Sequence, residues 1–200
     1  MPNPRNVKGG FVHFDSNAQM GAVVAFQFNP ETLERTIIPV DPGNERRQMI
    51  RFTLEFDATD ALERGDPTVG ALGIHPALAA LEMLAQKTKD AAGCVPNSAS
   101  EGLGGGVPFT LFVWGSRRII PIKFIQLIVR ETMFDGQLNP LRATVDVSLE
   151  FLSDAELNTI PRARAFMDTF LEQKEWLAGQ SGSSGPTEEM LAAVKNKPSG

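Results

Sequence analysis

The feature that most constrains this sequence is a regular alternation of apolar and polar side chains over residues 141–151. The apolar positions are Leu141, Ala143, Val145, Val147, Leu149 and Phe151, and the polar positions between them are Arg142, Thr144, Asp146, Ser148 and Glu150. Successive side chains of a β-strand point to opposite faces of the sheet. A period of two therefore predicts a half-buried strand in an antiparallel sheet.

The residues just before this strand predict a hairpin turn. Asp135 and Gly136 are expected to form a tight reversal with a positive φ at that dipeptide. Asn139 then leads into Pro140, which stands at the first strand position, where a backbone N–H is not needed. The chain is therefore expected to reverse immediately upstream of residue 141.

The partner strand in this hairpin is expected over residues 123–133. Straight alternation puts apolar residues on both of its faces, with Phe124 and Ile128 on one and Ile125, Leu127 and Val129 on the other. A strand that is apolar on both faces is covered twice, once by its own core and once by a second layer or another chain.

Other segments also have strand patterns. Residues 23–29, 50–57 and 109–115 are the clearest, and residues 11–15 are a weaker candidate. A further strand begins near residue 118, and Pro121 within it predicts an edge position or a bulge, because proline cannot donate to the ladder.

Two helices are predicted. The first covers residues 75–92, closes at Gly93, and has an apolar stripe of Leu78, Leu81, Ala85 and Thr88 with Leu84 beside it. The second follows the capping-box spacing of Ser153 and Glu156. It starts or restarts at Pro161 and runs to about residue 177. Its candidates for the buried side are Ile160, Arg164, Met167, Phe170 and Leu171.

The domain organisation follows from these elements and from composition. Residues 1–178 form one α+β domain, mainly antiparallel β, in which residues 98–108 are a glycine-rich loop. Residues 179–186 have the composition of a flexible linker, and residues 187–200 form a short arm.

Composition excludes several classes of protein. The net charge of −5 and pI of about 5.1 leave no basic footprint, so nucleic acid is not expected as a partner. The single Cys94 is interpreted as an inert thiol in a reducing compartment. The sequence has no signal-peptide pattern and no apolar run that could span a membrane, so the cytoplasm is the expected location.

Residues that could carry chemistry are few, and each is interpreted as structural. His13 is expected in a strand and His75 at a helix start. The glycine run at residues 102–106 lacks a phosphate-loop motif and favours a flexible loop. The acids of residues 56–66 lack the EF-hand pattern and favour a solvated turn over a calcium site. We therefore expect no enzyme activity, no cofactor and no metal.

Five blocks occur in a characteristic order along most of the chain, roughly residues 8–178. They are FQFNPETLERT, FTLEFDATDAL, HPALAALEML, PFTLFVWG and FDGQLNPLRATVDVSLEF. Together they resemble the tube-type N-terminal domain of contractile injection systems, the phage-tail-like particles of bacteria. The matching motif positions are Phe28, Asn29, Pro30, Trp114, Gly115, Gly136, Pro140, Leu141, Arg142 and Ala143.

The resemblance implies a baseplate or tube-initiator protein whose β-sheets roll into a barrel-like domain with a flanking helix and a C-terminal helix. Six copies are expected to close into a ring with a continuous inner β-wall, and the motif positions are expected to be structural. The implied partners are other copies of the chain, inner-tube proteins, the spike or hub protein and other baseplate subunits, with sheath subunits as a further option.

The chain departs from several relatives in that family, which carry a C-terminal LysM domain. Only about twenty residues follow Gly179 here, which argues against peptidoglycan binding and makes the arm a candidate contact with a neighbouring baseplate subunit. The polar face of residues 142–150 would line the lumen, meet a neighbour or simply be solvated. Two alternatives stay open, a repeated inner-tube subunit and, from a different class, a small-molecule-binding β-barrel.

Overall fold

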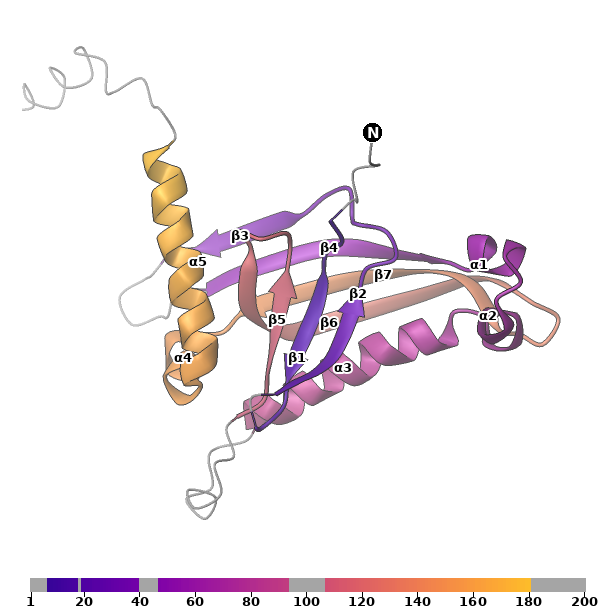
Figure 1. The fold of residues 1–200 in the computed structure, drawn as a ribbon, viewed down its shortest axis with the longest axis horizontal. Helices are drawn as coiled ribbons and strands as arrows, with labels where there is room; N and C mark the ends of the chain where they lie inside the picture. Colours follow the sequence, from indigo (N-terminus) through magenta and orange to yellow (C-terminus); the bar gives the residue numbers. More distant parts are fainter. Residues whose placement is uncertain (1–6, 18, 40–46, 94–106, 181–200) are drawn as a thin grey trace, which may run out of the picture.

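The computed structural model describes residues 7–17, 19–39, 47–93 and 107–180, and Figure 1 shows its ribbon. Cys94, the glycine run of residues 102–106 and the expected arm of residues 187–200 lie outside the described residues. So do all but the first two residues of the expected linker, 179–186.

The described elements are seven strands and five helices. The strands are β1 (Gly10–Phe14), β2 (Met20–Ala25), β3 (Glu34–Ile38), β4 (Arg47–Asp57), β5 (Phe109–Val113), β6 (Ile119–Phe134) and β7 (Pro140–Phe151). The helices are α1 (Thr59–Glu63), α2 (Pro67–Leu72), α3 (His75–Gly93), α4 (Asp154–Thr159) and α5 (Pro161–Gly179). The strands form one sheet in the order β2-β1-β5-β6-β7-β4-β3, and every pairing is antiparallel. The α+β class with mainly antiparallel strands is confirmed.

Strand β7 lies inside the sheet, between β6 and β4. Val147, for example, is in register with Phe52 of β4 and with Leu127 of β6. Its inward side chains from residue 143 to residue 151 are all buried, while Leu141 at the entry is partly buried. The predicted half-buried strand is confirmed.

Strand β6 contains a bulge that sequence alternation could not show. Phe124 pairs with Leu149, but the next pair joins Gln126 to Ser148, so Ile125 is the extra residue. Beyond it, Leu127 faces the core as Phe124 does, while Ile128 lies on the opposite face with Asp146 as its partner. The predicted grouping of Phe124 with Ile128 was therefore wrong, because one inserted residue reverses the facing of every later side chain.

Pro121 is buried inside the sheet and not at an edge. It lies in β6, where it pairs with Leu111 of β5, and its carbonyl oxygen accepts a hydrogen bond from Leu152 N at 3.2 Å. The first β6–β7 pair follows one residue later, at Ile122. The edge prediction was therefore wrong. Proline is tolerated here because its missing N–H falls just before the hydrogen-bonded ladder to β7 begins. The bulge in this strand occurs at Ile125 and not at Pro121.

The β6–β7 turn is built differently from expectation. The positive φ angles belong to Met133 (57°) and Leu138 (66°), and Gly136 is not in the left-handed region. The carboxylate of Asp135 organises the turn, because its Oδ1 accepts hydrogen bonds from the backbone N–H groups of Gln137 and Asn139, both at 2.8 Å. An aspartate side chain bonded to its own turn replaces the glycine conformation that the dipeptide suggested.

The strand expected over residues 23–29 ends earlier, at Ala25. Its partner β1 begins at Gly10, which pairs with Ala25, so the chain beyond has no strand to continue against. Phe26 is still buried, but Phe28 is 42% exposed. Strand β3 and the short helices α1 and α2 were not predicted.

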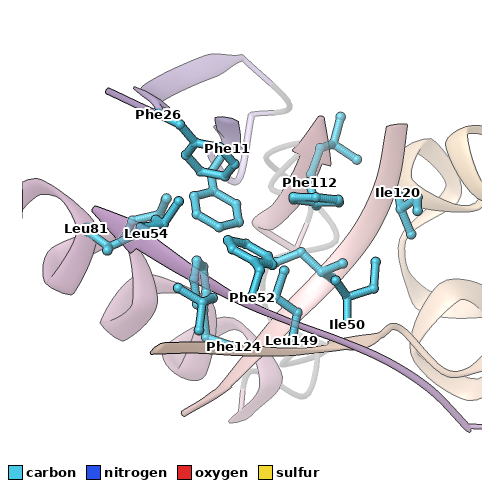
Figure 2. Packing of buried hydrophobic residues seen from close by; sticks show 14 of the residues in the cluster. Phe11, Phe26, Ile50, Phe52, Leu54, Leu81, Phe112, Ile120, Phe124 and Leu149 are labelled. Atoms are coloured by element: carbon cyan, nitrogen blue, oxygen red, sulfur yellow. The ribbon is translucent and has the colours of Figure 1, made fainter. Parts of the chain in front are cut away.

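The sheet is rolled around an aromatic core, which Figure 2 shows from close by. Phe11 of β1 and Phe52 of β4 have ring centroids 6.4 Å apart, although three strands lie between β1 and β4 in the sheet. Phe112 lies 5.5 Å from Phe52, and Phe124 lies 4.9 Å from Phe11. Edge strands β2 and β3 do not pair with each other, so the roll is not a closed barrel.

The helices cover the sheet and its ends. Helix α3 packs on β6, β2 and β5 and buries Leu78, Leu81 and Leu84. Helix α5 packs on β6, and Figure 1 places α4 and α5 at one end of the long axis, with α1 and α2 at the other. The capping box before α4 is confirmed, since Ser153 Oγ accepts from Glu156 N and Glu156 Oε2 accepts from Ser153 N.

The buried face of α5 differs slightly from the predicted one. Ile160, Met167 and Phe170 are buried as expected, and Leu171 is partly buried. Arg164 instead keeps 41% of its side chain exposed and pairs with Asp168 at 3.2 Å. Ala163, one position earlier, is fully buried. Because a guanidinium group needs water or an ionic partner, Arg164 lies at the surface, and the neighbouring Ala163 faces the core.

Candidate assembly surfaces

The two edges of the rolled sheet expose apolar side chains. On β2, Met20 is 65% exposed and Val23 is 57% exposed. On β3, Ile37 and Ile38 are 46% and 45% exposed. Within the part of the chain that the structure describes, each of these strands pairs on one side only. Such edges present backbone N–H and C=O groups that another strand can pair with.

One side chain links the chain just after β2 to β4, the strand that pairs with edge strand β3. Gln27, just after β2, accepts a hydrogen bond from Asp57 N at 3.0 Å and donates one to Asp57 O at 2.6 Å. The amide therefore bonds the last residue of β4 as a strand partner would. Sequence reasoning missed Gln27, because its partner is thirty positions away and no local pattern links the two.

The predicted Phe28, Asn29 and Pro30 motif holds the segment that precedes β1. Asn29 Oδ1 accepts from Gly9 N at 2.8 Å, and its Nδ2 donates to Val7 O at 2.8 Å. Lys8 Nζ bonds the carbonyl of Gln27 and lies 5.9 Å from the centroid of the Phe28 ring. The motif therefore ties the segment before β1 to the chain that follows β2.

The predicted Trp114 and Gly115 motif meets the same segment from the other side. A Cβ on Gly9 would lie 2.6 Å from Trp114 Cε3, so the indole occupies the space above that glycine. Gly115 has a φ of +67°, and Trp114 N donates to Arg118 O at 2.7 Å, which closes the β5–β6 turn. Tertiary structure thus brings Asn29 and Trp114 together around Gly9.

A hollow next to these residues joins the first motif to the hairpin motif. The larger part, of about 560 Å³, is lined by Lys8, Phe28, Asn29, Pro30, Glu31, Thr32, Thr53 and Glu55. A neighbouring part of about 300 Å³ shares Phe28 and adds Arg142 and Ala143. Phe28 and Arg142, which lie far apart in the sequence, therefore line one surface.

Arg142 is fixed there by an ion pair. Its Nε lies 2.7 Å from Asp57 Oδ2, and about half of the Arg142 side chain remains exposed. Hydrogen bonds from the Thr59 side chain and backbone, together with Arg142, hold the pKa of Asp57 below its ordinary value. Arg142 is thus held in place while part of it stays accessible to a neighbour.

The rest of the predicted motif supports the hairpin. Pro140 O accepts from Ile74 N at 2.9 Å, and Leu141 O accepts from Ala58 N at 2.8 Å. Both bonds tie β7 to the segment that carries α1 and α2. Gly136 lies in the exposed turn of the same hairpin, between the paired residues Phe134 and Pro140.

Ion pairs connect the polar face of β7 to the neighbouring strands β4 and β6. Arg130 and Thr53 bond Asp146 and lower the pKa of its carboxyl. Glu150 is only 6% exposed, contrary to its expected place on an open polar face, and its Oε1 lies 2.5 Å from Arg47 Nε. Because Arg47 reaches it from the start of β4, no local pattern could have revealed this burial.

Lys123 extends that network to helix α4. Its Nζ lies 3.8 Å from Glu150 Oε2 and 2.9 Å from Glu156 Oε1. Burial by itself raises the pKa of Glu156, but the hydrogen bonds from Lys123 and Ser153 outweigh burial and lower it. The end of β7 is thereby tied to β4, β6 and α4.

The two histidines occupy structural positions. His13 in β1 is buried, and its Nδ1 lies 3.1 Å from Thr110 Oγ1. Burial, followed by the charge of Lys87, lowers the pKa of His13. His75 is exposed at the start of α3, and the acids of residues 56–66 lie mostly in and around α1 instead of in an irregular loop.

No protein-family model matches this sequence, and no curated protein is significantly similar to it. Among the described residues, no group of three or more histidine, cysteine, aspartate or glutamate side chains is placed to hold a metal ion. None of the described helices is long and apolar enough to cross a membrane.

Proposed function

We propose that this chain is a structural assembly protein of a bacterial contractile injection system. It forms a ring at the baseplate-proximal end of the inner tube and joins the tube to the spike hub. The observation that supports this function best is the rolled sheet, whose core is filled with aromatic rings. Within the described residues its two edge strands each pair on one side only and expose Met20, Val23, Ile37 and Ile38. Edges of this kind are a liability in a lone chain and a means of joining in a ring.

The ring and its partners follow from the resemblance of the five sequence blocks to tube-type domains. Six copies surround the lumen, and the tube proteins, the hub and other baseplate subunits meet the faces of the ring. Assembly starts in the bacterial cytoplasm and uses shape and edge complementarity without catalysis. A repeated shaft subunit would use the same surfaces and would differ in copy number.

The small-molecule-binding barrel has less support from this fold. The rings of Phe11, Phe52 and Phe112 contact one another where a ligand would have to lie. A barrel that binds a small molecule keeps an enclosed apolar space for it. The two hollows beside Phe28 are instead lined mainly by charged and polar residues of the strand and loop surface.

Sedimentation of a native lysate tests the proposal. We expect this protein to migrate with a particle of megadalton size, at a few copies beside many copies of tube and sheath proteins identified by mass spectrometry. Abundance equal to that of the tube protein would make the chain a shaft subunit. A 21.7 kDa monomer at the top of the gradient, in cells that make particles, would overturn the assembly function.

Arg142→Glu is expected to give a folded monomer that fails to incorporate into particles. The side chain is half exposed, so losing its pair with Asp57 should change the free energy of unfolding by only about 1 kcal/mol. The substitution would replace a positive charge by a negative one on the surface that Arg142 shares with Phe28. The measurement is the variant's share in the particle fraction, beside its melting temperature.

Lys87→Glu, an equal charge reversal at an exposed position of α3, serves as the matched control and is expected to incorporate normally. Particles that contain Arg142→Glu at the wild-type level would show that Arg142 has no role in an interface.

A further inference from the structure

The β6–β7 hairpin presents an apolar tip to solvent. Leu138 is 77% exposed, Met133 is 57% exposed and Phe134 is 50% exposed. Figure 1 shows this hairpin turn at the same end of the long axis as α1 and α2. We call this end, with its tip, the hairpin end. Three large apolar side chains gathered on one tip are typical of a contact surface.

The tip is held in a strained conformation. Met133 and Leu138 both have positive φ angles, a conformation that is unfavourable for L-residues other than glycine. The structure maintains them through the Asp135 turn and through Asn139, whose Nδ2 donates to Ala71 O at 3.2 Å. Strain that the surroundings maintain is found where a side chain is presented for function.

Acidic side chains surround this tip. Residues 58–75 and 131–139 contain one basic side chain, Arg64. Their carboxylates are five: Asp60, Glu63, Asp66, Glu131 and Asp135. Arg142, which is the cross-strand partner of Thr132, is paired with Asp57, so the hairpin end combines an apolar centre with a negative rim.

The opposite end of the molecule also exposes apolar residues. Ile37 and Ile38 of β3 are nearly half exposed, and on α5 Trp176 is 57% exposed and Leu177 is 40% exposed. Figure 1 shows the end of β3 and helix α5 at this end, which we call the helix end. A hollow of about 200 Å³ opens nearby, lined by Leu33, Arg35, Ile50, Phe112, Arg118 and Ile120.

Three arginines make this second surface basic. Arg35 and Arg118 line the hollow, and the guanidinium of Arg117 lies 5.4 Å from the centroid of the Trp176 ring. In the described part of the chain, no salt bridge engages any of these three arginines. Glu34 of β3 and Glu172, Lys174 and Glu175 of α5 also lie at this end, so the three arginines leave it with a small excess of positive charge.

We propose that the hairpin end of one copy docks on the helix end of a second copy. The apolar tip meets the apolar patch and the hollow, and the acidic rim faces the arginines. Because the two surfaces differ, the contact is heterologous, and it gives a ring when the rotation between copies closes. The inference rests on the proposed function and deepens it by naming a contact between copies in addition to the sheet edges.

A reciprocal charge exchange on the full chain tests this contact. The first variant carries Arg117→Glu and Arg118→Glu, and the second carries Asp60→Lys and Glu63→Lys. Each variant alone meets its own copies with like charges, and we expect a monomer by sedimentation velocity where the wild type associates. A one-to-one mixture has complementary charges at both contacts, so we expect association to return.

The control variant carries Arg51→Glu and Lys87→Glu, which change the net charge by as much as the first variant, on β4 and α3. It is expected to associate as the wild type does. Association of either single variant at wild-type strength, a mixture that stays monomeric, or a wild type that is monomeric up to about 1 mM would each overturn the proposed contact.

The same variants separate this inference from the proposed function when they are expressed in cells that make particles. If the Arg117→Glu, Arg118→Glu variant is a monomer by itself but sediments with particles, the proposed assembly function is retained and the end-to-end contact is overturned. If the wild type self-associates as expected but never sediments with particles, the contact is retained and the injection-system function is overturned.

Discussion

Val147→Asp is expected to leave the chain unable to fold. Val147 is 1% exposed in the middle of β7, between Phe52 of β4 and Leu127 of β6. A carboxylate there has no cationic partner on the apolar face, and burying it costs several kcal/mol. Because small domains have about 5–15 kcal/mol of total stability, this cost is comparable to the whole. Circular dichroism and the yield of soluble protein are the measurements.

Ser148→Asp is the matched control for this substitution. Ser148 is the next residue of β7, on the opposite face, and Arg51 of β4 is its cross-strand partner. Opposite charges across strands contribute about 0.2–1 kcal/mol, so this variant should fold with wild-type stability or slightly more. A Val147→Asp variant that melts cooperatively at the wild-type temperature would show that this face of β7 is not the core.

Gly73→Ala is expected to cause the second largest loss of stability. A Cβ at this position would lie 2.3 Å from the carbonyl oxygen of Pro140, a backbone atom that cannot turn aside. The residue also has φ of 57° and ψ of −137°, a conformation that costs other residues about 1–3 kcal/mol. Relieving the contact would pull the α2–α3 junction away from the hairpin and break the bond from Ile74 N to Pro140 O.

The measurement for Gly73→Ala is urea unfolding, and we expect a loss of at least about 2 kcal/mol from strain and the lost contact together. Gly70→Ala in the same helix is the control. Nothing lies within 4 Å of the position that a methyl group would take at Gly70, and Gly70 is outside the positive-φ set. Alanine should therefore stabilise α2 by about 0.5–1 kcal/mol. Equal midpoints for the two variants would mean that the junction adjusts freely.

The elements that sequence predicted well are those whose evidence is local. The alternation of residues 141–151 identified β7, and the same period of two identified β4 from residue 50 onward. The spacing of Ser153 and Glu156 identified the start of α4. In each case neighbouring residues contain the whole signal, because strand facing and helix capping depend on positions a few residues apart.

The elements that sequence predicted badly depend on distant partners. Ile125 is a bulge only because Gln126 pairs with Ser148, and β2 ends at Ala25 only because β1 begins at Gly10. Glu150 is buried because Arg47 reaches it from another strand. The residues next to Ile125, Ala25 and Glu150 in the sequence do not indicate any of these features.

The candidate surfaces divide in the same way. Sequence by itself determined which strands are amphipathic, where two helices begin, and which motif residues to examine, because these properties follow from the local period of the chain. Tertiary structure alone decided that Asn29 and Trp114 meet at Gly9, that Phe28 and Arg142 share a surface, and that the apolar tip and the arginines lie at opposite ends. The physical reason is that strand order and the rolling of the sheet come from pairing and packing between residues far apart in the chain.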